Sequence, residues 1–222
     1  MSVGSRILAR IWHLPPPDTR DIVQSRGIRI AMSDGVDLLA DRYYPRGGER
    51  LPVVLIRSPY GRDHQFRDLA LILAERGFQV LLQSCRGTGG SGGILNPIFH
   101  EEQDGADTVG WLSRQPWHSG RIALLGTSYL GNAAWAVVAS GPQIAAMVLH
   151  ATLSDARAET YAFGGFTLEG CLIWTLQLTQ PELGGTVPLL LEGKLAQRQD
   201  AIPALPALDL LPLRDVDQSA TP

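Results

Sequence analysis

Short apolar runs alternate with helical segments between residues 51 and 151. A continuous apolar run such as Leu51–Ile56 is typical of a strand buried on both faces of a parallel sheet. A segment with helical periodicity, Phe66–Arg76, ends before Gly77, a common residue just past a helix C-terminus. Strands that alternate with helices at this spacing predict an α/β fold with a mostly parallel sheet and right-handed crossovers. The predicted strands are Leu51–Ile56, Phe78–Gln83, Arg121–Leu125 and Ile144–Ala151, and the predicted helices are Phe66–Arg76, Glu101–Gln115 and Tyr129–Ser140.

The segment before this region predicts a β-hairpin. Ile28–Met32 and Val36–Tyr44 are rich in β-forming residues, and the turn signal Ser33-Asp34-Gly35 separates them. We therefore expect an N-terminal extension over residues 1–26, followed by a sheet domain that starts at residue 27.

The pattern changes again after residue 155. Ala156–Gln180 is mostly helical in pattern, Leu189–Gln199 predicts another short helix, and prolines interrupt the remainder. No further buried strand is predicted before Pro222. We expect residues 27–155 to form the N-terminal part of the sheet domain and residues 156–222 to form part of a helical region inserted into it.

Composition and charge narrow the possible partners. The net charge is −3 and the arginines are scattered, so neither nucleic acid nor an acidic membrane surface is expected as a partner. The N-terminus lacks the pattern of a signal peptide, and no apolar run reaches about 18 residues. We therefore expect a cytoplasmic protein. Cys85 and Cys171 are expected to be free, partly buried thiols, and no metal site or cofactor is predicted.

The best candidate for chemistry is the segment Gly126-Thr127-Ser128-Tyr129-Leu130-Gly131, which lies between a predicted strand and a predicted helix. Such a strand–turn–helix context is the one that a nucleophile elbow requires. The tight turn needs small neighbours, here Gly126 and Gly131, and it lifts the hydroxyl of Ser128 above the carboxyl end of the sheet. The N-terminus of the following helix then favours a developing oxyanion.

A second glycine-rich segment, Arg86–Gly93, also follows a predicted strand. It raises the alternative of a nucleotide-binding protein. No Gly-Lys-Ser or Gly-Lys-Thr closes the segment as in a P-loop, so this alternative rests on a glycine-rich turn alone.

Four stretches, taken together in order and spacing, resemble the cocaine-esterase-like and X-Pro dipeptidyl-peptidase family of serine hydrolases. The resemblance covers the chain from about residue 25 to its end. The four stretches are Ser33-Asp34-Gly35-Val36 leading to Tyr44-Pro45, Arg57-Ser58-Pro59-Tyr60, Arg86-Gly87-Thr88-Gly89 followed by Ser91-Gly92-Gly93, and Gly126-Thr127-Ser128-Tyr129-Leu130-Gly131.

The resemblance implies an α/β-hydrolase fold and a role for three residues. Ser128 would be the nucleophile that accepts the acyl group. The backbone N–H of Tyr129 and the phenolic hydroxyl of Tyr60 would be the two oxyanion donors. The substrate would be a small ester or an amide, including an X-Pro peptide, and the resemblance implies no cofactor.

The chain departs from the family pattern at two places. The family usually has an aspartate where this chain has Ser84. Family members also place the catalytic aspartate and histidine after a helical cap, and then add a C-terminal β-sandwich. Nothing here resembles those segments, so we expect a truncated chain that ends within the cap.

Local residues are weak substitutes for the missing base. His150 is the only histidine after Ser128 and lies near the end of a predicted strand, while His64 follows Tyr60 in a loop expected to overlook the site. Asp155 reads as a helix N-cap. A serine without a base is a poor nucleophile, so the chain alone is expected to be nearly inactive. The remaining candidates, expected at surface or capping positions, are His13, His100, His118, Asp200, Asp209, Asp215 and Asp217.

Two functional hypotheses remain open. The first is a hydrolase that acts through an acyl-enzyme on Ser128. The second is a non-catalytic α/β-hydrolase-like module that binds a ligand. An open parallel sheet also exposes an apolar edge, so a complementing chain or a second copy is a further candidate partner.

Overall fold

The computed structural model describes residues 3–48, 50–153 and 155–179, and the predicted helix Leu189–Gln199 lies outside these ranges. By its internal contacts the chain divides into two compact units, Met1–Asp155 and Ala156–Pro222. The first unit contains the sheet together with Tyr60, Ser128 and Tyr129.

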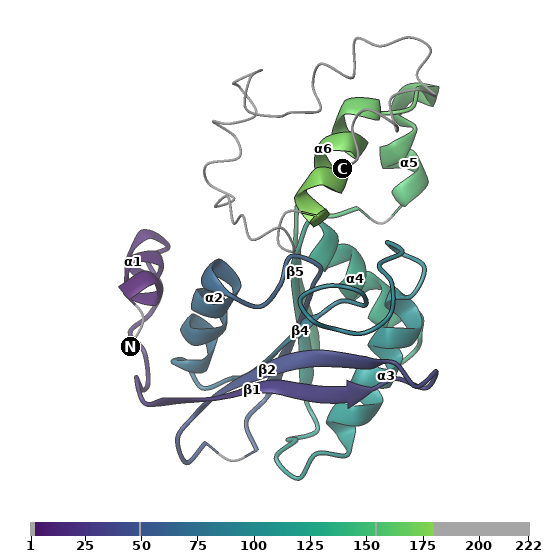
Figure 1. Ribbon diagram of the computed structural model, residues 1–222. Helices are drawn as coiled ribbons and strands as arrows, with labels where there is room; N and C mark the ends of the chain where they lie inside the picture. Colours follow the sequence, from purple (N-terminus) through teal and green to yellow (C-terminus); the bar gives the residue numbers. More distant parts are fainter. Residues whose placement is uncertain (1–2, 49, 154, 180–222) are drawn as a thin grey trace. The chain divides into compact units, whose positions relative to one another are not determined.

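The first unit is a mixed sheet flanked by helices (Figure 1). The strands lie in the order β1-β2-β4-β3-β5-β6. The hairpin strands pair antiparallel with each other, and β2 also pairs antiparallel with β4, whereas β4, β3, β5 and β6 are mutually parallel. The bounds are β1 Ile22–Ala31, β2 Asp37–Pro45, β3 Val53–Ser58, β4 Gln79–Ser84, β5 Ile122–Thr127 and β6 Ala146–His150.

Helices cover both faces of this sheet (Figure 1). One face packs on α2 through Phe66, Ala70 and Ala74. The other face packs on α3 and α4 through residues such as Leu112 and Val137. The bounds are α2 His64–Ala74, α3 Glu101–Ser113 and α4 Tyr129–Ala139. The α/β fold expected from the sequence is therefore confirmed.

The degree of strand burial follows the position in the sheet. All six residues of β3 and of β4 are buried, as expected for central strands with helices on both faces. The last strand, β6, is different, because its residues are exposed or only half-buried. Among the described strands β6 has a neighbour on one side only, so its apolar sequence is not matched by burial.

The N-terminal part is more regular than the sequence predicts. The first strand begins at Ile22 rather than at residue 28, and a β-bulge between Ser25 and Ile28 interrupts its register. Gly27 has a φ of 63° within that bulge, a value that favours glycine. A helix, α1 (Val3–Ile11), precedes the strand and packs against α2.

Within its described residues, the second unit is helical. It consists of α5 (Ala156–Thr160), a short 3₁₀ turn at Ala162–Gly164 and α6 (Leu168–Thr179). The helical pattern predicted for Ala156–Gln180 is therefore confirmed over most of its length. The break falls at Gly164, whose φ of 85° does not continue a helix.

Candidate active site

Ser128 occupies a sharp turn between β5 and α4. Its φ is 53° and its ψ is −126°, far from both helical and strand values. A positive φ is uncommon for a residue with a side chain, and strained backbone of this kind is concentrated at functional sites. The side chain of Ser128 is exposed. This is the backbone geometry that a nucleophile elbow requires.

Two close approaches explain why glycines flank this turn. A Cβ atom at Gly126 would lie 2.3 Å from the carbonyl carbon of Leu130, which belongs to the backbone of α4. A Cβ atom at Gly131 would lie 2.4 Å from the Oγ1 of Thr152. Neither position has room for a side chain, so the turn depends on both glycines.

Hydrogen bonds fasten the turn to the chain after β6. The N–H of Ser128 donates to the carbonyl oxygens of His150 and Ala151, each at 3.1 Å. The carbonyl oxygen of Ser128 accepts from the hydroxyl of Thr152 at 2.8 Å and from the N–H of Gly131 at 3.0 Å. The strained residue is therefore held through both its N–H and its carbonyl group.

Tyr60 and Ser128 lie at the same edge of the sheet. The parallel strands β3 and β5 are neighbours, with Leu55 opposite Leu124. Tyr60 lies two residues beyond the end of β3, and Ser128 lies one residue beyond the end of β5. The helices that follow these two strands cover opposite faces of the sheet, and in open α/β sheets ligands bind beside the carboxyl ends of the strands at such a point.

The Tyr60 side chain is half-buried and packs beside Phe66 of α2. The two rings are parallel within 10° and their centroids are 6.4 Å apart. The N–H of Tyr60 donates to the Oγ of Ser58 at 3.1 Å, which fixes the backbone just after β3.

Tyr129 has a buried side chain, which the sequence did not predict. Only 4% of the residue is exposed. Its hydroxyl donates to the Oε1 of Glu101 at 2.9 Å and accepts from the N–H of Ile98 at 2.8 Å. Burial, and then the negative charge of Glu101, raise the pKa of the Tyr129 phenol. The phenol therefore stays protonated and remains a hydrogen-bond donor.

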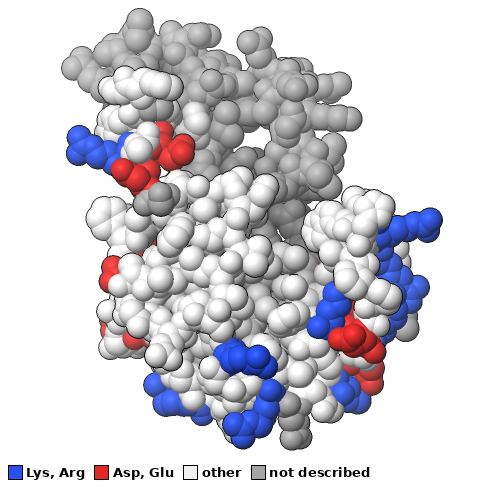
Figure 2. All heavy atoms as spheres, turned by 180° about the vertical axis from the view of Figure 1, so that it is seen from behind, with Lys and Arg blue, Asp and Glu red and all other residues white. Residues whose placement is uncertain are grey.

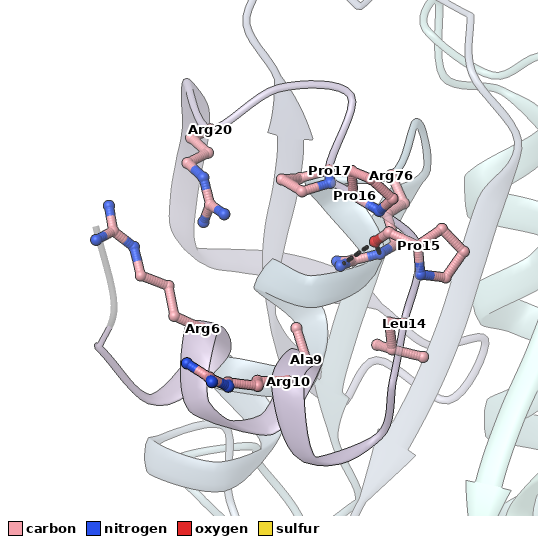
Figure 3. A pocket seen from close by; sticks show the side chains of 9 residues that line it. All are labelled: Arg6, Ala9, Arg10, Leu14, Pro15, Pro16, Pro17, Arg20 and Arg76. Atoms are coloured by element: carbon pink, nitrogen blue, oxygen red, sulfur yellow. Dashed lines mark hydrogen bonds between the residues drawn. The ribbon is translucent and has the colours of Figure 1, made fainter.

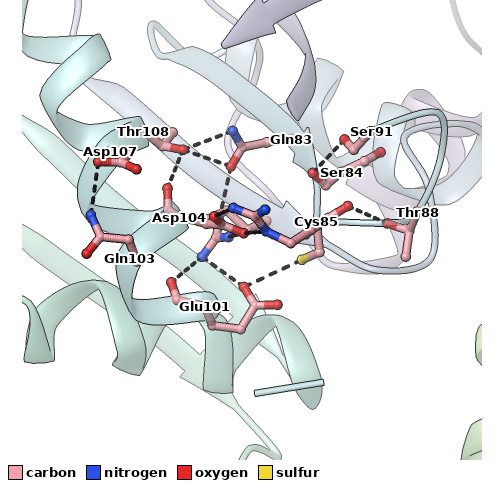
Figure 4. A network of polar contacts seen from close by, with 12 residues as sticks. Gln83, Ser84, Cys85, Thr88, Ser91, Glu101, Gln103, Asp104, Asp107 and Thr108 are labelled. Carbon is pink, nitrogen blue, oxygen red and sulfur yellow. Dashed lines mark hydrogen bonds and ion pairs between the residues drawn. The ribbon is translucent and has the colours of Figure 1, made fainter. Parts of the chain in front are cut away.

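Glu101 belongs to a buried cluster of charged side chains (Figure 4). Its Oε2 lies 2.9 Å from a guanidinium nitrogen of Arg57, and its backbone carbonyl accepts from the same nitrogen at 2.7 Å. Arg86 forms a two-pronged ion pair with Asp104, and Arg57 is 3.9 Å from Asp104. Two arginines thus face two carboxylates, and the buried charges balance.

Glu101 and Asp104, at the start of α3, are thus buried ion-pair partners. Cys85, a free and fully buried thiol, lies 3.7 Å from Glu101. Burial, and then the charge of Glu101, raise the pKa of the Cys85 thiol well above its usual value.

The position of Ser84 shows how the chain accommodates its departure from the family pattern. The Oγ of Ser84 accepts a hydrogen bond from Arg62 at 2.5 Å. The same arginine donates to the carbonyl of Gly89 and pairs with Asp41 of β2 at 3.4 Å. Arg62 thus connects the loop after β3 to β2 and to the glycine-rich segment.

Ser128 has no hydrogen-bonded base among the described side chains. The hydroxyl of Ser128 has no hydrogen-bond partner within that part of the chain. The His150 ring is exposed, with its Nδ1 3.3 Å from the Oγ1 of Thr127, and His64 is the first residue of α2. Asp155 lies immediately before α5, where an N-cap is expected, and the four later aspartates lie outside the described residues.

A hollow lined by several arginines lies near the amino ends of the parallel strands, opposite to the end that carries Ser128 (Figure 3). It has a volume of about 470 Å³ and lies between α1 and the chain that precedes β4. Arg76 lines it and donates to the carbonyl oxygen of Pro15 at 2.7 Å. Because Arg76 precedes β4 whereas Ser128 follows β5, this hollow does not lie beside the elbow. Its lining residues are Arg6, Ala9, Arg10, Leu14, Pro15, Pro16, Pro17, Arg20 and Arg76.

Three general features complete the description. Over the described residues, no group of three or more His, Cys, Asp or Glu side chains could hold a metal ion. None of the helices in that part of the chain is long and apolar enough to cross a membrane. Figure 2 shows charged side chains in small separate groups rather than in a continuous basic stripe.

Comparison with known proteins gives three results. Residues 34–211 match the model of the X-Pro dipeptidyl-peptidase (S15) family. The cocaine esterase of Rhodococcus sp. (strain MB1 Bresler) is 32% identical over 186 residues, which cover 79% of this chain and 30% of the esterase. The CocE/NonD family hydrolase of Staphylococcus aureus superimposes with a TM-score of 0.63 at 20% identity, over 78% of this chain and 36% of that one.

A third relative has the same fold. The crystal structure of an aminopeptidase from a Thaumarchaeota archaeon gives a TM-score of 0.59 at 23% identity, over 75% of this chain and 31% of that one. At such identities the solved structures establish the α/β-hydrolase fold and no more. The chain spans between 30% and 36% of the length of these three relatives.

Proposed function

The chain belongs to the X-Pro dipeptidyl-peptidase (S15) family of hydrolases, and from that membership we propose that it hydrolyses ester or amide bonds through an acyl-enzyme on Ser128. The observation that carries the proposal is the backbone of Ser128, with its φ of 53° at the β5–α4 turn. A strained turn costs stability, and strained residues are concentrated at functional sites. The strain at Ser128 is therefore best explained by a function of its exposed hydroxyl.

The chemistry proposed for the site is acyl transfer. The Oγ of Ser128 attacks the carbonyl carbon of the substrate, its proton passes to a base, and the alcohol or amine leaves after it is protonated. Water then attacks the acyl-enzyme and releases the acid. The N–H of Tyr129, at the first position of α4, and the hydroxyl of Tyr60 are the proposed oxyanion donors. Loss of one such donor costs roughly 3–4 kcal/mol of transition-state stabilisation.

The general base is proposed to lie outside the described residues. Within them the Ser128 hydroxyl has no partner, and the His150 ring contacts Thr127 instead. We therefore propose that this chain by itself is nearly inactive, because a serine without its base retains only the small rate due to the oxyanion hole and binding.

An ester is the preferred substrate class. The family takes its name from X-Pro dipeptides, whereas the relative at 32% identity is named as a cocaine esterase. An X-Pro peptidase must also bind the free amino terminus of its substrate, which an esterase does not require. A non-catalytic, ligand-binding module is the second candidate, and it is favoured by the Ser128 hydroxyl, which has no hydrogen-bond partner among the described residues.

A fluorophosphonate probe tests these proposals, because it labels only an activated serine. The natural polypeptide that contains this sequence is treated in a native lysate, and the labelled peptide is identified by mass. We expect labelling on Ser128 that disappears in the Ser128→Ala variant and persists in Ser140→Ala, a control at the opposite end of α4.

The outcomes separate the candidates. A natural polypeptide that is present and folded but not labelled would favour the ligand-binding module. Labelling of the isolated chain at 24.1 kDa would overturn the proposal that it is nearly inactive by itself.

A further inference from the structure

Tyr129, the first residue of α4, has a polar side chain in a position where packing alone would not require one. Its backbone lies next to Ser128, and its side chain is buried in a charged cluster behind the elbow. An apolar side chain would fill the same space without the requirement for a buried hydrogen-bond partner. The hydroxyl therefore needs an explanation beyond packing.

The hydroxyl of Tyr129 is held from two directions. It donates to the Oε1 of Glu101 at 2.9 Å and accepts from the N–H of Ile98 at 2.8 Å. The other oxygen of Glu101, Oε2, lies 2.9 Å from Arg57. Both carboxylate oxygens are thus engaged, and the phenol cannot shift without breaking a buried contact.

Arg57 extends this connection to the second proposed oxyanion donor. It is the fifth residue of β3 (Val53–Ser58), and its Nε donates to the side chain of Gln83 in β4 at 3.0 Å. Only 2% of Arg57 is exposed. Tyr60 follows three residues later, with its N–H bonded to Ser58. One chain of buried contacts therefore runs from the N-terminus of α4 to β3, the strand that precedes Tyr60.

We propose that Tyr129, Glu101 and Arg57 form a positioning device, here called the Tyr129 anchor, which fixes the N-terminus of α4 relative to β3 and so holds the two oxyanion donors in register. This inference rests on the proposed function of Ser128. Oxyanion donors act only within a narrow range of distance, and a displacement of about 1 Å in an active site can reduce the rate about a hundredfold.

The buried charges of the Tyr129 anchor are better explained by positioning of α4 than by a gain in stability. A buried ion pair contributes little net stability compared with a well-packed apolar contact. Hydrogen bonds are directional, whereas apolar contacts are not. The anchor thus fixes the orientation of α4 to a degree that apolar packing does not provide. Tyr129 and Glu101 are positioning residues in this proposal, because their side chains act through the backbone of the elbow.

The test compares two variants that each lose one buried hydroxyl. Tyr129→Phe removes the hydroxyl of the anchor. Thr108→Val removes a hydroxyl of the same cluster that bonds Gln83 and the carbonyl of Asp104 and has no hydrogen bond to the described residues of α4. Both are made in the natural polypeptide that contains this sequence, and the rate of fluorophosphonate labelling of Ser128 is measured together with Tm.

We expect both variants to lower Tm by similar amounts, because each loses a buried hydrogen bond. The labelling rate should fall about tenfold or more in Tyr129→Phe and stay within about twofold of the unmodified protein in Thr108→Val. With an ester substrate, Tyr129→Phe should lower kcat and leave KM nearly unchanged, because positioning of the oxyanion donors acts on the transition state.

Equal labelling rates in the two variants, or an unchanged rate in Tyr129→Phe, would show that the anchor serves stability alone. If the unmodified polypeptide were not labelled on Ser128, the proposed function would fail, and this inference would fail with it. The two failures are therefore distinguishable.

Discussion

At the scale of single residues, the elbow depends on two glycines whose positions leave no room for a Cβ atom. Gly126 and Gly131 each face a neighbour closer than 2.5 Å from the position that a Cβ would take. The sequence predicts this requirement, because small residues at these spacings accompany a nucleophile elbow. It does not predict which atoms approach, since Leu130 and Thr152 reach the turn from different elements.

We expect Gly126→Ala to displace the elbow. The new methyl would meet the backbone of Leu130 at 2.3 Å, and overpacking of this kind costs roughly 1–3 kcal/mol. Urea denaturation measures the loss of stability, and fluorophosphonate labelling of Ser128 in the natural polypeptide should be abolished.

Gly110→Ala is the matched control. Its Cβ would lie 3.6 Å from the nearest atom, a side-chain nitrogen of Arg114, and the site is inside α3. Alanine in a helix interior stabilises by up to about 1 kcal/mol relative to glycine. If Gly126→Ala behaved like this control, the elbow would be less constrained than the geometry indicates.

At the scale of elements, the sequence predicts the sheet better than the contacts between its parts. The four parallel strands and three helices follow from apolar runs and helical periodicity, with differences of one or two residues at their ends. The pairing of β3 with the start of α3 through Arg57 and Glu101 does not follow. Forty-four residues separate these side chains, and no local pattern connects them.

A double-mutant cycle tests the link between β3 and α3. Arg57→Met leaves Glu101 buried without its counter-charge, so we expect a loss of about 3–5 kcal/mol in the free energy of unfolding. Glu101→Met should cost a similar amount. The double variant keeps Arg86 paired with Asp104, so its cost should be well below the sum of the two single costs.

Urea denaturation of the three variants gives these free energies. Costs that simply add would mean that the two side chains do not interact in solution.

At the scale of the whole molecule, β6 presents an exposed apolar edge. Val148 of β6 is 61% exposed and Trp135 of α4 is 42% exposed, although both belong to segments of apolar sequence. Among the described strands β6 pairs only with β5. We propose that, in the isolated chain, a second copy of this chain covers this edge.

We expect the isolated chain to elute as a species heavier than 24.1 kDa in size-exclusion chromatography with light scattering. Val148→Lys should shift it toward the monomer, because a lysine on an edge strand opposes pairing. Ile94→Lys is the control, since Ile94 is 83% exposed and lies in the loop before α3. A monomeric unmodified chain at micromolar concentration would contradict this proposal.

The sequence by itself determined the fold class, the hairpin, the succession of strands and helices along the chain from residue 51 to residue 151, and the position of Ser128 at the β5–α4 turn. These features depend on residues close together in the chain, whose apolar spacing and glycines can be read directly. The tertiary structure alone showed the buried Tyr129 hydroxyl, the charge-balanced cluster around Glu101, and Asp41 as the carboxylate that Arg62 contacts. Such contacts join distant parts of the chain, and burial, which gives them their strength, exists only once the sheet and its helices have packed.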